Sequence, residues 1–174
     1  MIYWIKCVFL LINLISLQAY SSEYAIPKAF HSIASSENVP VKVLYAITLQ
    51  ESQAKTNLGR VIPWIYTLND GEKGYYYKTS AELKAHILFL LSQDNENFDV
   101  GIGQINYRWH KDNFSSIDEM IDPVSNLRYA AKYLKKHYGK YNNWWLSVGA
   151  YHAPVNKALA DSYMKKVYKK WLKL

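Results

Sequence analysis

Cysteine is almost absent from this sequence: the 174 residues contain one, Cys7, close to the N-terminus. A single thiol excludes a disulfide framework and a site in which several cysteines hold a metal. The five histidines lie at positions 31, 86, 110, 137 and 152 and show no HxxxH or HExxH spacing, which argues against a zinc site. Any chemistry is therefore expected to depend on carboxyl, amide, hydroxyl and imidazole groups without a bound metal.

Long apolar runs are also lacking, except near the N-terminus. The first six residues carry one positive charge, and residues 7–17 are apolar apart from Asn13. This run is too short to span a bilayer comfortably, and it is followed by small residues, Ala19 and Ser21, that suit cleavage. We expect residues 1–21 to be a signal peptide of an exported protein; an uncleaved anchor is the alternative.

Acidic residues are few relative to basic ones: 14 Asp and Glu against 21 Lys and Arg give a formal charge of +7. Many of the lysines lie between positions 132 and 173. Such a protein is attracted to anionic polymers or membrane surfaces, unless the lysines only solvate a helix face. Because the chain has an export signal, we do not expect nucleic acid to be its partner.

The spacing of apolar residues predicts one mostly α-helical domain with a small β-hairpin. Strand-forming residues around a turn cluster place the hairpin within residues 61–78. Asn38, Ser80 and Asn143 are expected to cap helices, and Gly139 to end one. The predicted helices span residues 23–36, 40–52, 80–93, 122–139, 144–151 and 155–174.

Glu51 stands out because it lies on the apolar face of a predicted helix. Leu44, Ile47 and Glu51 occupy positions i, i+3 and i+7, which share one side of an α-helix. Burying an ionised carboxylate without a partner is costly, so such a group tends to keep its proton. A carboxylic acid that is still protonated near neutral pH can serve as a general acid.

Three segments, taken in order, resemble the soluble lytic transglycosylase family. They are Glu51-Ser52, the Asp-Val-Gly-Ile-Gly-Gln-Ile-Asn segment of residues 99–106, and residues 126–134 with 145–152 after them. The likeness covers roughly residues 24–160. It implies a lysozyme-like domain of the goose type over residues 22–174 that cleaves bacterial peptidoglycan, and hence a periplasmic or cell-wall-associated protein.

The resemblance assigns roles residue by residue. Glu51 matches the family's catalytic acid, and residues 101–104 match its Gly-Leu-Met-Gln segment, which lines the cleft. Residues 150–151 match the start of its Ala-Tyr-Asn-Ala-Gly segment, whose tyrosine reaches the active site; the Tyr151 hydroxyl is expected to hold the Glu51 carboxyl or to bond the substrate. The implied substrate-binding residues are Ser52, Gly103, Gln104, Ile105, Asn106, Tyr151 and His152.

The chain departs from the family pattern at three positions in these segments. Gly103 replaces the usual methionine, His152 replaces the usual asparagine, and Pro154 stands where glycine is common. These changes leave open how the loop packs and how the tyrosine segment contacts a substrate.

The implied reaction needs one carboxyl group. In the family, the glutamate protonates the β-1,4 glycosidic oxygen between N-acetylmuramic acid and N-acetylglucosamine and then acts as a base while the muramoyl C6 hydroxyl closes onto C1. The product is a 1,6-anhydro sugar, and no metal or organic cofactor is needed. Two alternatives stay open: a goose-type hydrolase in which Asp99 activates water, and a catalytically idle peptidoglycan-binding module.

Residues 60–95 make the chain longer than the minimal family domain. This hairpin and helix resemble an insertion in members tied to conjugation and secretion systems. The expected partners are therefore peptidoglycan glycan strands and components of a secretion, pilus or conjugation machine. We also hypothesise that the hairpin walls the glycan groove and that Trp64 or one of Tyr75, Tyr76 and Tyr77 stacks on a sugar.

Overall fold

A computed structural model describes residues 25–57 and 59–174. The predicted signal peptide, residues 1–21, and the first two residues of the helix predicted over 23–36 lie outside the described residues. Within the described part of the chain, no helix combines the length and the apolar character that crossing a membrane requires.

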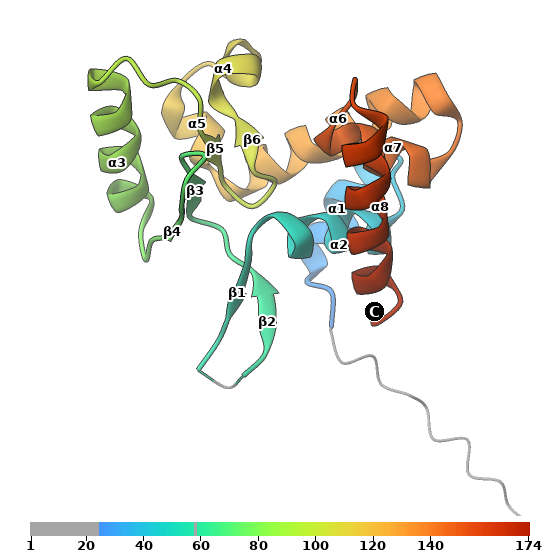
Figure 1. The fold of residues 1–174 in the computed structure, drawn as a ribbon. Helices are drawn as coiled ribbons and strands as arrows, with labels where there is room; N and C mark the ends of the chain where they lie inside the picture. Colours follow the sequence, from blue (N-terminus) through green and yellow to red (C-terminus); the bar gives the residue numbers. More distant parts are fainter. Residues whose placement is uncertain (1–24, 58) are drawn as a thin grey trace, which may run out of the picture.

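Five helices build the larger part of the molecule (Figure 1). Helix α2 lies at its centre and buries every residue from Val43 to Leu49, and it packs against α1 and α8. Helix α7 packs against both α6 and α8. The prediction of a mostly helical fold is confirmed. The bounds of these helices are α1 Lys28–Ser36, α2 Val41–Glu51, α6 Pro123–Tyr141, α7 Trp144–His152 and α8 Lys157–Trp171.

A four-stranded antiparallel sheet with the order β4-β3-β5-β6 forms the second part. Its register pairs Asn69 with Asp99 and Asp99 with Asn106, while the next row pairs Leu68 with Val100 and Val100 with Ile105. Because side chains alternate across a strand, the polar row and the apolar row face opposite sides of the sheet. The strands are β3 Thr67–Asn69, β4 Gly74–Tyr76, β5 Asp99–Val100 and β6 Ile105–Asn106.

The apolar row of this sheet belongs to the core. Leu68, Val100 and Ile105 are all buried, together with Phe98 and the inner face of α3. The polar row is thereby left on the opposite side, where a hollow lies between the sheet and the helices. The remaining elements on this side are α3 Ser80–Ser92, α4 Tyr107–His110, the short 3-10 helix η1 Lys111–Asn113 and α5 Ile117–Ile121.

The predicted hairpin is present as β3 and β4, and a second hairpin was missed. Strands β1 Gln53–Lys55 and β2 Val61–Pro63 pair antiparallel directly after α2. The sequence between them contains Asn57 and Gly59. This hairpin was not predicted because its two strands are short and mostly polar or half-buried.

Three predicted helix boundaries were wrong for local reasons. Helix α1 begins at Lys28 and not at residue 23, because Pro27 disfavours a helical conformation at the residue before it. Asn38 has a positive φ of 54° and precedes the helix, so Pro40 takes the N-cap position of α2. Thr79, one residue before the predicted Ser80, caps α3 in a capping box with Glu82.

Helix α6 continues through Gly139, which was expected to end it. It stops at Tyr141, where the next residue, Asn142, adopts the left-handed conformation that asparagine tolerates better than most residues. The predicted cap at Asn143 is confirmed, since its side chain accepts hydrogen bonds from the backbone N–H groups of Trp145 and Leu146.

Candidate active site

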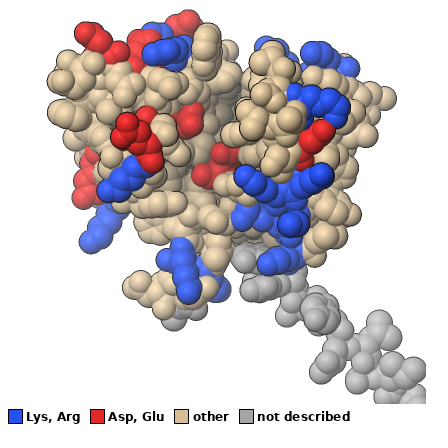
Figure 2. Space-filling model, in the orientation of Figure 1, with Lys and Arg blue, Asp and Glu red and all other residues tan. Residues whose placement is uncertain are grey.

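A cleft of about 800 Å³ lies between the sheet and the helical part. Figure 2 shows the corresponding hollow between two halves of the molecular surface, with acidic side chains at its inner end. One wall comes from the polar row of the sheet and the loop after β5, and the other comes from the end of α7 and the residues that follow it. The polar lining residues used below are Glu51, Asn69, Asp99, Gln104, Asn106 and His152.

Glu51 is the last residue of α2 and lines this cleft half-buried. Burial raises its pKa from 4.5 to about 8. A hydrogen bond from Tyr163 opposes this increase, and the negative charge of Asp99 adds to it. The raised pKa expected from the position of Glu51 on an apolar helix face is therefore confirmed, and the carboxyl group holds its proton at neutral pH.

Tyr163 positions the Glu51 carboxyl group. The Tyr163 hydroxyl donates a hydrogen bond to Glu51 Oε1, although the two residues come from α8 and α2. The Tyr163 ring is 4 % exposed, and the imidazole of His152 stacks on it with ring centroids 4.5 Å apart. The sequence analysis did not identify Tyr163 as a site residue, and the one available signal was that a buried phenol requires a hydrogen-bond partner.

Tyr151 was expected either to hold the Glu51 carboxyl group or to bond the substrate, and in the structure its hydroxyl bonds to the backbone instead of to Glu51. Its hydroxyl donates to the carbonyl oxygen of Gly103 at 2.7 Å, so Tyr163 and not Tyr151 holds Glu51. The Tyr151 ring is buried but still lines the cleft. This hydrogen bond links α7 to residues 101–104, which are called the glycine segment below, and so helps to fix the width of the cleft.

The glycine segment is fixed from behind by Asn126, which is fully buried in α6. Its side-chain oxygen accepts from the Gly103 N–H at 2.9 Å, and its amide nitrogen donates to the carbonyls of Val100 and Met120 at 3.1 and 2.9 Å. At Gly101, which has a φ of +76°, a Cβ atom would lie 2.5 Å from the Asn126 amide nitrogen. Glycine is therefore required at position 101 by both backbone conformation and space.

Ser52 also acts on this segment from inside the protein. The residue is buried, and its hydroxyl lies 2.9 Å from the carbonyl oxygen of Ile102, to which it donates. Gly103 is equally enclosed, because an added Cβ would lie 2.9 Å from that of Ala130. Neither Ser52 nor Gly103 is among the residues that line the cleft, so both are placed to shape the segment behind the cleft wall.

Gln104 adopts a positive φ of 46°, which directs its side chain back onto the sheet. Its amide nitrogen donates to Thr67 Oγ1 at 2.9 Å and to the Gly101 carbonyl at 3.0 Å. Since both amide hydrogens are used within the protein, the carbonyl oxygen is the part of this side chain that remains for a ligand, and it can only accept.

Asp99 lies in the same cleft as Glu51. Burial raises its pKa, and a 2.9 Å hydrogen bond from the Asn106 amide opposes that increase. In the sequence, this aspartate was named only as the base that would activate water in a hydrolase. The structure places its carboxyl group in the polar row of the sheet, near enough to Glu51 to raise the pKa of the latter.

The predicted inserted hairpin walls the cleft through Asn69, but its aromatic rings do not line it. The Trp64 indole N–H donates to the Tyr77 carbonyl at 2.7 Å, and the Tyr77 hydroxyl bonds to His86. The hydroxyls of Tyr75 and Tyr76 bond to Asp70 and to the Gln53 carbonyl, respectively. The polar groups of the four side chains proposed to stack on a sugar thus form hydrogen bonds outside the cleft, and their rings do not line it.

Six of the eight residues singled out from the sequence meet in the cleft: Glu51, Gln104, Ile105, Asn106, Tyr151 and His152. A carboxylic acid with a raised pKa and a set of amide groups together form a site that can protonate a bond in a polar, neutral ligand.

Comparisons with known proteins agree with the sequence interpretation. The model of the family described as the transglycosylase SLT domain matches residues 28–172. Among solved structures, an inactive mutant of the lytic transglycosylase Slt from Pseudomonas aeruginosa is similar, with 15 % sequence identity and a TM-score of 0.45. The similarity covers 88 % of this chain and 21 % of that chain, so this chain spans about a fifth of the larger protein's length. The comparison with curated proteins gives no significant match.

Proposed function

Because the chain belongs to the transglycosylase SLT domain family, we propose that it is a peptidoglycan lytic transglycosylase with Glu51 as both acid and base. The observation that carries this proposal is the Glu51 carboxyl group itself: it lies in a polar cleft, has a pKa of about 8, and is oriented by Tyr163. At neutral pH such a group has a proton to donate, and an ordinary surface glutamate does not.

In the first step, Glu51 gives its proton to the glycosidic oxygen between N-acetylmuramic acid and N-acetylglucosamine, and the C1–O bond breaks. In the second step, the muramoyl C6 hydroxyl bonds to C1, and its proton returns to the Glu51 carboxylate. The product is a 1,6-anhydro sugar, and no water is consumed. The Tyr163 hydroxyl donates to the carboxylate formed between the steps and so lowers the cost of its burial.

The amide groups of the cleft suit an N-acetylated sugar chain. Gln104 offers a carbonyl oxygen that accepts from the N–H of an acetamido group, and so does Asn106, whose amide hydrogens go to Asn97 and Asp99, while the Asn69 amide can donate. We propose that these three side chains, together with the backbone at Ile105 and with Tyr151 and His152, contact the glycan. Ser52 and Gly103 support the site indirectly through the segment they hold.

A hydrolase is the second candidate, and Asp99 is the specific observation in its favour. A hydrolase needs a base to activate water in addition to the acid, and Asp99 lines the same cleft as Glu51. Its side chain accepts a hydrogen bond from Asn106, which would help to orient it toward a water molecule. The two mechanisms give different products, so they are separable by experiment.

We further propose that residues 1–21 direct export and that the enzyme opens peptidoglycan locally for a secretion, pilus or conjugation machine. Two features support this proposal: the apolar N-terminal run in the sequence, and the hairpin and helix at residues 60–95 that resemble the insertion of members tied to such machines. Loss of the protein would then reduce transfer through the machine, and Glu51→Gln would not restore it.

The decisive test is digestion of purified peptidoglycan followed by separation of the released muropeptides. We expect 1,6-anhydro ends from the wild-type protein and none from Glu51→Gln. Reducing ends would establish hydrolysis and would overturn the transglycosylase proposal. Full activity of Glu51→Gln in wall opening would show that the protein acts as a binding module without catalysis.

A further inference from the structure

Trp109 lines the cleft but has no part in the proposed reaction. Its side chain is 74 % exposed, and it lines the same cavity as Glu51. Exposing a large indole to water is unfavourable, and single exposed apolar residues are common. Here, however, the exposed ring lines a polar cleft whose other lining residues include Asn106 and Asp99.

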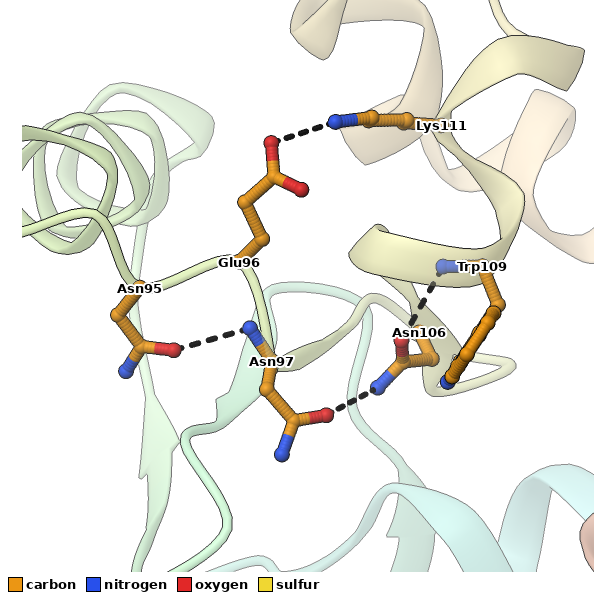
Figure 3. A network of polar contacts seen from close by, with 6 residues as sticks. All are labelled: Asn95, Glu96, Asn97, Asn106, Trp109 and Lys111. Atoms are coloured by element: carbon orange, nitrogen blue, oxygen red, sulfur yellow. Dashed lines mark hydrogen bonds and ion pairs between the residues drawn. The ribbon is translucent and has the colours of Figure 1, made fainter.

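The backbone that carries Trp109 is held firmly, as the close-up in Figure 3 shows. The Asn106 side chain caps α4 by accepting from the Trp109 N–H, and its amide nitrogen also contacts Asn97 and Asp99. A salt bridge of 2.5 Å between Lys111 and Glu96 fixes the far end of the helix to the loop before β5. The indole is thus presented to solvent from a rigid support.

Further contacts lock this short helix to the sheet. The Tyr107 N–H donates to the Phe98 carbonyl at 2.8 Å, and the two rings stack with centroids 4.9 Å apart. The Arg108 N–H donates to the Glu96 carbonyl. None of these contacts uses the indole of Trp109, so the fold places the indole without depending on it.

The geometry points to a saccharide-stacking subsite formed by Trp109 with Asn106 and Asn97. A pyranose ring has an apolar C–H face and a rim of hydroxyl and acetamido groups. A flat, exposed indole matches the face. On the rim, the Asn97 amide nitrogen can donate, and the side-chain oxygens of Asn97 and Asn106 can accept. Because Trp109 shares the cleft with Glu51, the ring that it binds belongs to the strand being cleaved, and this inference rests on the proposed function.

The neighbouring surface favours a neutral sugar over a charged or peptide ligand at this position. The side chain that caps α4 next to Trp109 is an uncharged amide, its hydrogens bond to Asn97 and to the Asp99 carboxyl group, and the charges of Lys111 and Glu96 are paired with each other. Phe89 on α3 is also exposed, at 59 %, but does not line the cleft. It provides a control: an exposed aromatic residue away from the cleft of Glu51.

The test uses soluble glycan strands prepared from peptidoglycan by removing the peptides. Glu51→Gln, alone and combined with Trp109→Ala, Trp109→Phe or Phe89→Ala, is titrated with these strands by calorimetry. We expect Trp109→Ala to weaken binding by about tenfold or more, since half-burying an indole against a sugar removes substantial apolar area from water. Trp109→Phe should recover part of the loss, and Phe89→Ala should change nothing.

Fluorescence supplies a second readout. Strands should shift the tryptophan emission of Glu51→Gln, and this shift should vanish in Glu51→Gln/Trp109→Phe. Equal affinity of the Trp109→Ala and parent proteins would overturn the inference while leaving the proposed function intact, provided that wild-type protein releases anhydro ends. If no variant binds strands and no anhydro ends form, the proposed function fails and the subsite with it.

Discussion

Replacing Glu51 with glutamine removes an ionisable group but keeps the size of the side chain and its ability to accept the Tyr163 hydrogen bond. Glutamine therefore resembles the protonated form of Glu51. The two proteins should differ in stability at pH values where the carboxyl group of the unfolded wild type is ionised, because burial opposes the same ionisation in the folded state. The comparison therefore measures how burial acts on this residue.

The sign follows from the direction of the pKa shift. The folded-state pKa of Glu51 is about 8, against 4.5 as the ordinary value, so between these pH values the folded state holds a proton that the unfolded state has released. The wild type then loses stability as the pH rises from 4.5 to about 8. At about 1.4 kcal/mol per pH unit, the loss is about 3 kcal/mol at pH 7 and approaches about 5 kcal/mol above pH 8.

Urea unfolding at a series of pH values measures this difference, with circular dichroism as the signal. Glu51→Gln and wild type should have equal free energies of unfolding at pH 4 and should diverge as the pH increases, with the variant more stable. A difference that does not change between pH 4 and pH 9 would refute the reasoning, because it would mean that Glu51 has an ordinary pKa in the folded protein.

Two further predictions concern the contacts around the acid. Tyr163→Phe removes the hydrogen bond that lowers the Glu51 pKa, so the alkaline limb of the pH–rate profile should move above pH 8 and kcat should fall about tenfold; an unchanged limb would contradict the assigned contact. Asn126→Ala leaves the Gly103 N–H and the carbonyls of Val100 and Met120 without their buried partner, which should cost about 3 kcal/mol in urea unfolding. A cost below 1 kcal/mol would show that the segment does not depend on Asn126.

The location of the acid could be predicted from sequence because it depends on a local pattern. The i, i+3, i+7 spacing that puts Glu51 on the face of Leu44 and Ile47 is a property of one helix. The cleft residues from Gln104 to Asn106 and the pair Tyr151-His152 were predicted differently. Each lies in a short contiguous segment, but their roles were implied by the resemblance of three such segments, taken in order, to the soluble lytic transglycosylase family.

What could not be predicted depends on contacts between distant parts of the chain. Tyr163 was not identified as a site residue, because its partner Glu51 lies on another helix and no spacing rule connects them. Asp99 was named only as the base of the alternative hydrolase, because its place beside Asn69 and Asn106 follows from strand register, which the sequence alone left open. Trp109 was missed since exposure is a property of the assembled surface.

The hydrogen bond from Tyr163 to Glu51 also has a consequence for the order of folding events. The two residues are 112 positions apart, and the tyrosine belongs to α8. Helix α2 can form before α8 has docked, but the Glu51 carboxyl group then lacks the hydrogen bond that orients it. The orientation of the acid is therefore acquired only when these two distant helices have come together.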